Sequence, residues 1–499
     1  MNLATIIDEH PDGHTALVVS GDHIGYGRLR AEVAAVRSGL VGLGLEPGDR
    51  VGIVCGTNDR FVRSWLGVLG AGLVAVPLNP QSPSPELAHE LGVVGARAVI
   101  VGPAGIAGIA GIDRSALVDL QFVLAPAGSS LPDAIDVDGL GLGLDVPVVD
   151  RAEADLAALL FTSGTAGAPR AARLTHGNLG SNLRQVQAHT AAAVRPDDVA
   201  VCAVPLFHVL GLNSMLDLGL MAGATLVLVE RFDPISFMET IEREKVTLLV
   251  GPPALWAALA EVEDPPTEAL ARIRLAVSGA APLPDRVARQ VQQRLGLRLD
   301  QGYGLTEASP SVTLATGEEA PTGSIGKPIA GIDIRLVDRD GADVLVGDVG
   351  EIWVRGPNVF DGYWNDPVAT ARVLDRAGWL HTGDMALVDE AGYLFIVDRA
   401  KDLIIVSGFN VYPAEVEEVL SEHDAVADVA VIGVAHPHSG ETVKAFVVVE
   451  PGRSVEEDEL IEWSATRLAR YKCPTKIDIV DEIPRGLGGK VIRRDLRSL

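Results

Sequence analysis

A ten-residue stretch from Phe161 to Arg170 combines side chains that suit the binding of an anion. It reads Phe-Thr-Ser-Gly-Thr-Ala-Gly-Ala-Pro-Arg and directly follows an apolar run that begins at Leu156. A buried strand that ends in such a loop presents backbone N–H groups, hydroxyl donors and one fixed cation to a phosphate chain. No Gly-Lys-Ser/Thr closes the stretch, so it is not a Walker A loop. A flexible surface turn is the alternative interpretation, and the stretch alone does not decide between the two.

Short apolar strands and amphipathic helices alternate in the residues that precede this loop. Strands are predicted at residues 15–19, 50–54 and 73–78, and helices at residues 29–43 and 59–70. Because this β-α-β-α order is typical of parallel sheets with helices on both faces, it predicts an α/β fold.

The residues after the loop continue the same pattern. Helices are predicted at residues 174–192 and 234–245, and strands at 199–204, 225–229, 246–250 and 273–277. Several of these strands end in glycine, proline or small residues, and such carboxyl ends frame the binding crevice of an open α/β sheet. The apolar stretch 199–229 carries one charge, Asp217, but proline, histidine and asparagine interrupt it. Core strands and a helix therefore explain it better than a membrane span.

The pattern changes after about residue 316. Alternating apolar and polar residues at 332–337, 350–354 and 392–397 predict antiparallel strands, and a charged stretch follows them. The last hundred residues predict a compact α+β unit, with a helix that begins at Pro413. Its other elements are a helix near 455–468 and strands near 429–434, 443–449 and 477–480.

Charge and cysteine content narrow the class of protein. The 499 residues include 67 acidic and 41 basic side chains, a net charge of −26, so neither a nucleic-acid surface nor binding to an anionic membrane is expected. No transmembrane segment is predicted, although peripheral membrane contact stays open. The three cysteines, Cys55, Cys202 and Cys473, form no metal-binding or disulfide pattern, and the N-terminus lacks a signal pattern. These features favour the cytoplasm.

Five segments together resemble the motifs of the adenylate-forming superfamily, which includes acyl-CoA synthetases, peptide-synthetase adenylation domains and firefly luciferases. They are residues 161–170, 301–307 (QGYGLTE), 379–384 (WLHTGD), 398–402 (DRAKD) and 484–490 (PRGLGGK), in the family's order and across essentially the whole chain. The resemblance implies a large N-terminal domain, residues 1–397, of stacked α/β sheet subdomains plus a β-barrel-like part. A hinge at 398–403 and a small mobile α+β domain at 404–499 complete the implied organisation.

The resemblance also implies two half-reactions. A carboxylate first attacks the α-phosphate of ATP and expels pyrophosphate, and the thiol of coenzyme A then displaces AMP. Both steps need stabilisation of charge more than proton transfer. In such an enzyme Thr306 contacts the α-phosphate, Lys490 bridges that phosphate and the carboxylate, and Glu307 holds Mg²⁺, which prefers one carboxylate plus phosphate oxygens.

The remaining site residues follow from the same resemblance. Tyr303 stacks on adenine, Asp384 accepts the ribose hydroxyls with help from Arg399, and His208 lies between the acid pocket and the thiol channel. Lys401 forms the hinge on which the C-terminal domain rotates between the half-reactions. The predicted nucleotide contacts, in full, are Thr162, Ser163, Gly164, Thr165, Gly167, Arg170, Ser278, Gly279, Ala280, Gly302, Tyr303, Gly304, Asp384, Arg399, Lys401 and Gly408.

The sequence departs from the family pattern at the end of the phosphate loop. The family usually has Pro-Lys-Gly-Val, whereas this chain has Pro169-Arg170-Ala171-Ala172. Arg170 keeps the positive charge in a planar fork, but Ala171 lacks the backbone freedom of glycine. The detailed conformation of the loop is therefore in question.

The combined prediction is an ATP-dependent acid–CoA ligase of lipid metabolism that uses ATP, Mg²⁺ and coenzyme A, as a monomer or a homodimer. The chain ends soon after Lys490, which favours a free-standing ligase over a peptide-synthetase module. A fatty acid is the first substrate hypothesis, because residues 250–256 and 278–282 offer small apolar walls, but aromatic and short branched acids stay open. Two alternatives are transfer to a carrier protein and a catalytically weak sensor that binds ATP or acyl-AMP. A luciferase-like oxygenase has no sequence feature of its own here.

Overall fold

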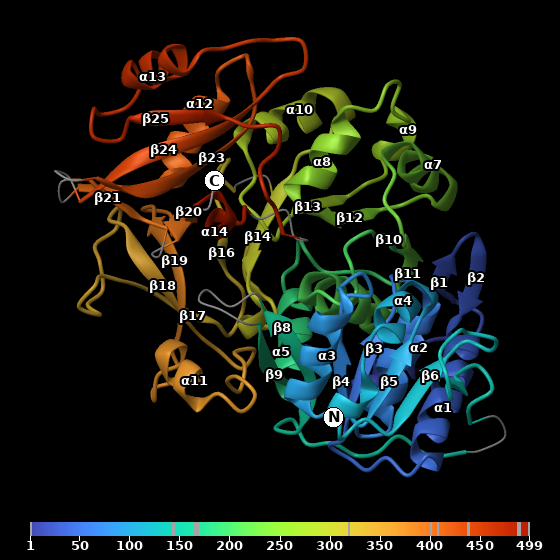
Figure 1. Ribbon diagram of the computed structural model, residues 1–499. Coiled ribbons are helices and arrows are strands. Elements are labelled where there is room, and N and C mark those ends of the chain that lie inside the picture. The colour runs from blue at the N-terminus through green and yellow to red at the C-terminus, as the bar shows by residue number, and fades with distance from the viewer. Residues whose placement is uncertain are drawn as a thin grey trace.

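The described residues form four β-sheets with helices around them (Figure 1). The structure is a computed structural model, and it describes residues 2–141, 145–162, 169–317, 320–399, 402–406, 409–436, 440–486 and 491–497. Three sheets belong to the large N-terminal part and one to the small C-terminal part. This arrangement confirms the predicted fold class.

The seven-stranded sheet carries the base of the predicted phosphate loop. Its strands run in the order β7 (Ile135–Asp136), β6 (Phe122–Ala125), β5 (Ala98–Val101), β3 (Arg50–Val54), β4 (Val74–Pro77), β8 (Leu156–Thr162) and β9 (Arg170–Thr175). All neighbours are parallel except β8 and β9. The helices between its strands and just before it are α1 (Tyr26–Gly42), α2 (Asp59–Gly70), α3 (Ser84–Val94) and α4 (Ile106–Ala110).

The nine-stranded sheet brings together strands from both ends of the N-terminal part. Its order is β16 (Lys327–Pro328), β15 (Ser311–Ala315), β14 (Asp300–Gly304), β13 (Leu275–Ser278), β12 (Leu248–Gly251), β10 (Val199–Cys202), β11 (Thr225–Leu228), β1 (Thr15–Val19) and β2 (Asp22–Gly25). The six strands from β14 to β1 are parallel. Its associated helices are α7 (Pro234–Glu244), α8 (Pro253–Ala260), α9 (Thr267–Leu270) and α10 (Asp285–Leu295).

One hydrophobic core joins these two sheets. It contains inward-facing residues of both, such as Ile53 of β3 and Leu226 of β11. Helix α5 (His176–Gln187), the π-helical stretch η4 (Leu210–Asp217) and α6 (Leu218–Ala222) contribute to the same core. The two sheets are therefore stacked layers, as the sequence predicted.

A four-stranded antiparallel sheet stands where the barrel-like part was expected. Its order is β17 (Asp333–Val337), β18 (Gly350–Arg355), β19 (Leu380–Val388) and β20 (Leu394–Arg399), and α11 (Pro367–Val373) lies between β18 and β19 in the chain. The C-terminal sheet has the order β22 (Phe409–Val411), β21 (Ile404–Val406), β24 (Gly440–Val449) and β23 (Val426–His436), with β25 (Lys476–Ile479) beside β24. Helices α12 (Pro413–Ser421), α13 (Glu457–Ala465) and α14 (Arg493–Leu496) accompany it.

The C-terminal unit, drawn in orange and red in Figure 1, lies beside α10 of the N-terminal part. The Arg286 guanidinium of α10 donates to the Ala427 carbonyl at 3.3 Å and lies 3.6 Å from the Glu450 carboxylate. Inside the C-terminal unit, Arg493 donates to Glu417 at 2.7 Å and approaches Asp402 at 3.5 Å. The beginning of this unit is thus tied to its last helix.

Most predicted strands lie within a few residues of their expected positions, but the helix predicted at 174–192 is wrong at both ends. Residues up to Thr175 belong to β9, and α5 spans only His176–Gln187. Thr175 caps that helix, since its hydroxyl accepts from the Asn178 backbone and the Asn178 side chain accepts from the Thr175 backbone. Leu174 and Thr175 pair with Ala158 and Leu156 of β8, and this strand pairing overrides their local preferences.

The apolar stretch 199–229 folds as β10, η4, α6 and β11, which confirms the prediction of core elements. Within the described residues no helix is long and apolar enough to cross a membrane. Asp217, the one charge of that stretch, is fully buried at the end of η4. Its Oδ1 accepts a hydrogen bond of 2.9 Å from the Trp65 indole of α2, and burial raises the pKa of its carboxyl to about 8.

Asp217 should therefore make stability fall as pH rises. The folded protein holds this proton more tightly than the unfolded chain, so the stabilisation is full below about pH 4 and is lost as pH approaches about 8. Asp217→Asn keeps an acceptor for Trp65 and removes the titration. We expect the urea midpoint of the wild type to decline more steeply from pH 5 to pH 8 than that of the variant. Parallel pH profiles of the two midpoints would contradict this role.

Candidate active site

The candidate site lies where the carboxyl ends of four neighbouring parallel strands meet. Strands β14, β13, β12 and β10 are consecutive in the nine-stranded sheet; predicted site residues lie at the ends of β14, β13 and β10, and a predicted pocket wall follows β12. A Cβ atom placed on Gly279, after β13, would lie 3.8 Å from both the Gly302 carbonyl of β14 and the Leu210 side chain. The structure thus brings three separate predicted segments to one edge of the sheet, as expected for an open α/β fold.

The turn after β13 contains a buried hydroxyl and a strained residue. Ser278 is 2% exposed, and its Oγ has no hydrogen-bond partner among the described residues. Ala280 has φ +69°, in the left-handed region that residues with a side chain rarely adopt. Buried unpaired donors and such backbone strain cluster at binding sites, so this turn suits a ligand that supplies an acceptor.

The segments predicted to bind adenine and ribose are directly joined. The Tyr303 hydroxyl donates a hydrogen bond of 2.7 Å to Oδ2 of Asp384, which is 7% exposed. Asp384 lies on β19 opposite Arg399 of β20, of which the structure describes only the backbone. The predicted ribose-binding pair is therefore adjacent, and Tyr303 from β14 lies beside it.

The turn after β14 carries Thr306 and Glu307 on the short 3₁₀ helix η5 (Thr306–Ala308). A Cβ atom on Gly304 would lie 2.2 Å from the Pro310 carbonyl oxygen, so only glycine fits where the chain reverses. Glu307 accepts a hydrogen bond of 2.7 Å from the Tyr363 hydroxyl. Sequence reasoning missed Tyr363, because nothing in its own surroundings indicates a partner 56 residues away.

Two further residues that sequence reasoning missed hold this turn. The Asn213 amide of η4 donates to the Ser309 carbonyl at 2.6 Å, and the Asn358 amide donates to the Ala308 carbonyl at 2.7 Å. Both asparagines are fully buried. A polar residue inside the apolar stretch 199–229 was the available signal for Asn213, since buried amides are retained where backbone groups need partners.

Strands β8 and β9 pair antiparallel at the base of the phosphate loop. Arg170 at the start of β9 pairs with Thr162 at the end of β8, and Ala171 pairs with Phe161. Ala171 is 2% exposed and extended, so this position makes no use of glycine's backbone freedom. The departure from the family pattern is therefore compatible with an ordinary strand. The Arg170 guanidinium lies 3.2 Å from Asp366.

His208 lies half-buried in the turn between β10 and η4. Its Nδ1 accepts from the Leu210 backbone at 3.3 Å, and its carbonyl accepts from Leu212 at 2.9 Å. Residues 250–256 were predicted to line the acid pocket. Trp256, however, is fully buried in a separate core and donates to the Gly251 and Val277 carbonyls. Trp256 therefore braces β12 against β13 from behind the loops.

Several predicted residues lie outside the described part of the chain. They are Ser163, Gly164, Thr165 and Gly167 of the phosphate loop, Lys401 and Gly408 near the hinge, and Lys490. Their predicted roles stay predictions.

Glu307 is the carboxylate that the motifs assign to Mg²⁺. No group of three or more His, Cys, Asp and Glu side chains with the geometry of a metal site occurs in the described ranges. Glu307 is half-buried beside Thr306, and Mg²⁺ in nucleotide sites is bound by one or two carboxylates together with phosphate oxygens. The donor set thus fits a metal that arrives with ATP.

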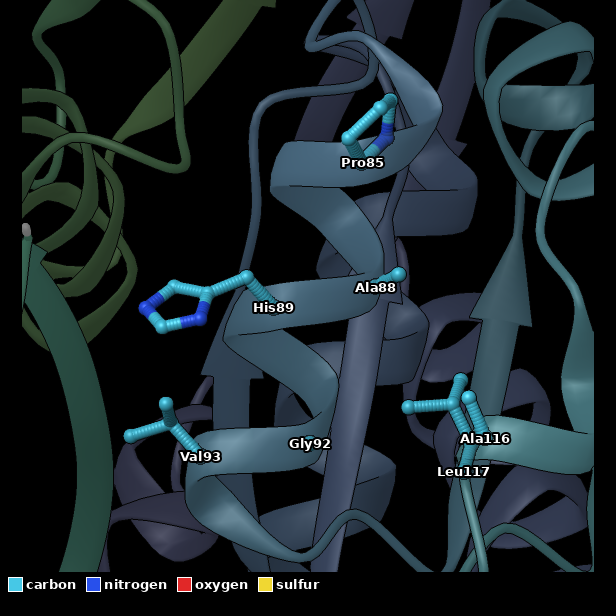
Figure 2. A pocket seen from close by; sticks show the side chains of 7 residues that line it. All are labelled: Pro85, Ala88, His89, Gly92, Val93, Ala116 and Leu117. Carbon is cyan, nitrogen blue, oxygen red and sulfur yellow. The ribbon is translucent and has the colours of Figure 1, made fainter.

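A surface hollow of about 500 Å³ lies apart from these elements, between α3 and the segment at Leu117 (Figure 2). Figure 2 shows Ala88 directed toward Leu117, whereas His89 and Val93 extend from the opposite side of the helix. None of the residues that line it belongs to the predicted site, and they include no charged carboxylate or guanidinium.

Comparison with known proteins places the chain in a family. The model of the AMP-binding enzyme family matches residues 3–364, and the model of the AMP-binding enzyme C-terminal domain matches residues 415–490. The chain belongs to this adenylate-forming family, as its motifs indicated.

This chain is similar over nearly its whole length to relatives whose names give two kinds of acid substrate. A feruloyl-CoA synthase of Amycolatopsis sp is 39% identical over 97% of this chain and 95% of its own length. A long-chain-fatty-acid–CoA ligase of Yersinia pestis is 37% identical over 94% of this chain and 88% of its own length.

Solved structures agree with the fold. The crystal structure of ATP-bound MatB from Rhodopseudomonas palustris matches with a TM-score of 0.91 at 33% identity, covering 100% of this chain and 98% of that one. The apo form of the same protein matches with a TM-score of 0.81 over the same coverage. This structure thus resembles the ATP-bound arrangement more closely.

Ser278 and Ser309 provide a matched pair of buried hydroxyls for testing the site. Removing an unpaired buried hydroxyl costs the fold nothing, so Ser278→Ala should keep or raise the melting temperature. The same change should weaken ATP binding about three- to tenfold, the value of one hydrogen bond. Isothermal titration with ATP and thermal unfolding would measure the two effects.

The Ser309 hydroxyl already donates to the Asn358 carbonyl at 2.8 Å. Ser309→Ala should therefore destabilise the fold by about 1 kcal/mol. A loss of stability in Ser278→Ala as large as that in Ser309→Ala, with unchanged ATP affinity, would show that Ser278 serves the fold alone.

Proposed function

We propose that the protein is an ATP-dependent acid–CoA ligase, which forms an acyl-adenylate and then an acyl-CoA thioester. The observation that carries this proposal is the hydrogen bond between Tyr303 and Asp384, which unites two family segments at the carboxyl end of β14. Thr306 and Glu307 follow on the next turn. The residues proposed to contact adenine and ribose are thus adjacent, and those proposed to contact the phosphates follow Tyr303 within a few residues.

The chemistry follows from these groups. Thr306 and the phosphate loop hold the phosphates while the acid's carboxylate attacks the α-phosphorus, and pyrophosphate leaves. Mg²⁺, when bound with ATP at Glu307, supplies positive charge next to the leaving phosphates. His208, from the turn before η4, orients the acid, and Lys490 neutralises charge between carboxylate and α-phosphate. The thiol of coenzyme A then displaces AMP.

The proposed domain division is 1–397 and 404–499, with the hinge at 398–403. Asp398 at the end of β20 accepts from the Ala414 backbone of α12 at 3.0 Å, so the hinge contacts the C-terminal unit directly. The higher similarity to the ATP-bound neighbour supports assigning this arrangement to the first half-reaction. Rotation about Lys401 would then expose the acyl-adenylate to coenzyme A. A cytoplasmic location stays a prediction, favoured by three cysteines without disulfide partners.

An apolar acid is the proposed substrate class. Leu210, two residues after His208, lies close to Gly279, since a Cβ atom on Gly279 would be 3.8 Å from the Leu210 side chain, and neither residue offers a cation to a second carboxylate. A fatty acid is the first candidate from this lining. A phenylpropenoic acid is the second candidate, which the similarity to the feruloyl-CoA synthase favours.

A panel of acids tests the proposal. The purified protein with ATP, Mg²⁺ and coenzyme A should release pyrophosphate with saturated fatty acids or with ferulic and coumaric acids, and should release less with dicarboxylic acids. Thioester formation with free coenzyme A would exclude a requirement for a carrier protein. If none of the acids gives pyrophosphate release, the result would favour the sensor alternative and overturn the ligase.

Lys490 should matter in one half-reaction only. Lys490→Ala removes the charge between carboxylate and α-phosphate, so adenylation should fall by about 10²-fold or more, the usual effect of losing one group that stabilises the transition state. Attack of coenzyme A on supplied acyl-AMP should stay within about threefold. Quenched-flow assays of each half-reaction would measure this.

Lys476→Ala is the matched control, because that lysine is exposed and pairs with Asp478 at 3.1 Å on the surface of β25. It should leave both half-reactions unchanged. Equal losses in both half-reactions of Lys490→Ala would refute the role given to Lys490.

A further inference from the structure

The segment that follows β18 forms an additional strand-like partner for β9. The Arg173 backbone donates to the Gly362 carbonyl at 2.9 Å, the Trp364 backbone donates to the Ala171 carbonyl at 2.8 Å, and Ala172 bridges Tyr363. These bonds place Tyr363 beside the hairpin that carries the phosphate loop. The backbone of Tyr363 is thus held in place by its pairing with β9.

The side chain of Tyr363 links the phosphate-loop hairpin to the turn after β14. Its hydroxyl donates to Oε1 of Glu307 at 2.7 Å, and the Arg170 guanidinium lies over its ring at 5.9 Å. Arg170 is in turn oriented by Asp366, whose Oδ2 accepts from the Arg170 Nε at 3.2 Å. Asp366 is itself fixed, because its Oδ1 accepts from the Ala369 backbone and caps α11.

From these contacts we propose that Tyr363 is a positioning residue for the metal-binding carboxylate of Glu307, and that Arg170 acts through Tyr363. The hydroxyl occupies one oxygen of Glu307 and fixes the direction of the other. This inference rests on the proposed function, in which Glu307 receives Mg²⁺ together with ATP. The arginine that replaces the family's usual lysine thereby gains a role toward the metal, in addition to any contact with phosphate.

The geometry distinguishes this role from a plain phosphate contact. The Arg170 side chain is 30% exposed and its Nε is already engaged by Asp366, so its planar fork is oriented along the 363–366 segment. Lysine has no planar fork and could not hold an acidic partner and an aromatic face in the same way. If Arg170 acts through the metal, its loss should weaken ATP binding only when Mg²⁺ is present. If it contacts phosphate, its loss should weaken ATP binding with and without Mg²⁺.

The test measures ATP binding by isothermal titration without acid or coenzyme A, once with Mg²⁺ and once with excess EDTA. The dissociation constant in EDTA divided by that with Mg²⁺ reports how much the metal strengthens ATP binding, independently of turnover. Tyr363→Phe should lower this ratio about tenfold, because a hydrogen bond to a charged group is lost, and should leave the affinity in EDTA within about twofold. In a Glu307→Gln background, Tyr363→Phe should have no further effect on the ratio.

Two variants sharpen the test. Asp366→Asn removes the partner of Arg170 but keeps a side chain that can cap α11, so it should lower the same ratio less than Tyr363→Phe. Tyr393→Phe is the matched control, because its ring faces the Lys327 ammonium at 4.3 Å and phenylalanine keeps that contact. It should leave the ratio unchanged.

The outcomes separate this inference from the proposed function. An unchanged or higher ratio in Tyr363→Phe would overturn the positioning role even if the wild type releases pyrophosphate. Equal weakening of ATP binding with and without Mg²⁺ in Asp366→Asn would assign Arg170 to the phosphates and overturn its part in the proposal. Absence of pyrophosphate release with every acid, beside a normal metal-dependent ratio, would refute the ligase and leave the role of Tyr363 intact.

Discussion

The candidate site depends on the buried amides that hold the turn from Thr306 to Ser309. This turn contains one short 3₁₀ helix and its carbonyl groups have few regular partners, yet it lies in a largely apolar interior. Asn213 and Asn358 satisfy two of those carbonyls from different elements. An unpaired buried carbonyl would cost about 1–3 kcal/mol. The two amides avoid this cost and so stabilise the irregular turn that carries Thr306 and Glu307.

The same arrangement explains why the site is distributed over distant parts of the chain. Parallel strands bring the loops after β10, β13 and β14 to one edge, and the small antiparallel sheet adds Asp384, which accepts a hydrogen bond from Tyr303. Each loop contributes one or two polar groups against an apolar background. A candidate site built this way is held together by side chains from separate layers, so its geometry depends on how those layers stack.

The sequence predicted the sheet layers and the motif segments well, because apolar periodicity and short motifs are local signals. It could not predict the contacts between segments. Trp65 and Asp217 are 152 residues apart, and neither has a neighbour that indicates the other. The start of α5 was misplaced because Leu174 and Thr175 continue β9 through their pairing with Ala158 and Leu156 of β8, a contact that the local sequence does not show. The concern about Ala171 disappeared for the same reason, since an extended, paired residue needs no glycine.

The pairing of residues 361–364 with β9 has a consequence for self-association. β9 is the last strand of the seven-stranded sheet, and a bare outer strand would offer its backbone groups to a second molecule. Gly362 and Trp364 cover that edge, and the Arg173–Asp361 ion pair at 2.6 Å adds charge along it. Protection against intermolecular sheet growth and orientation of Tyr363 therefore reside in one short segment, so a substitution there would affect solubility as well as the position of the Tyr363 ring.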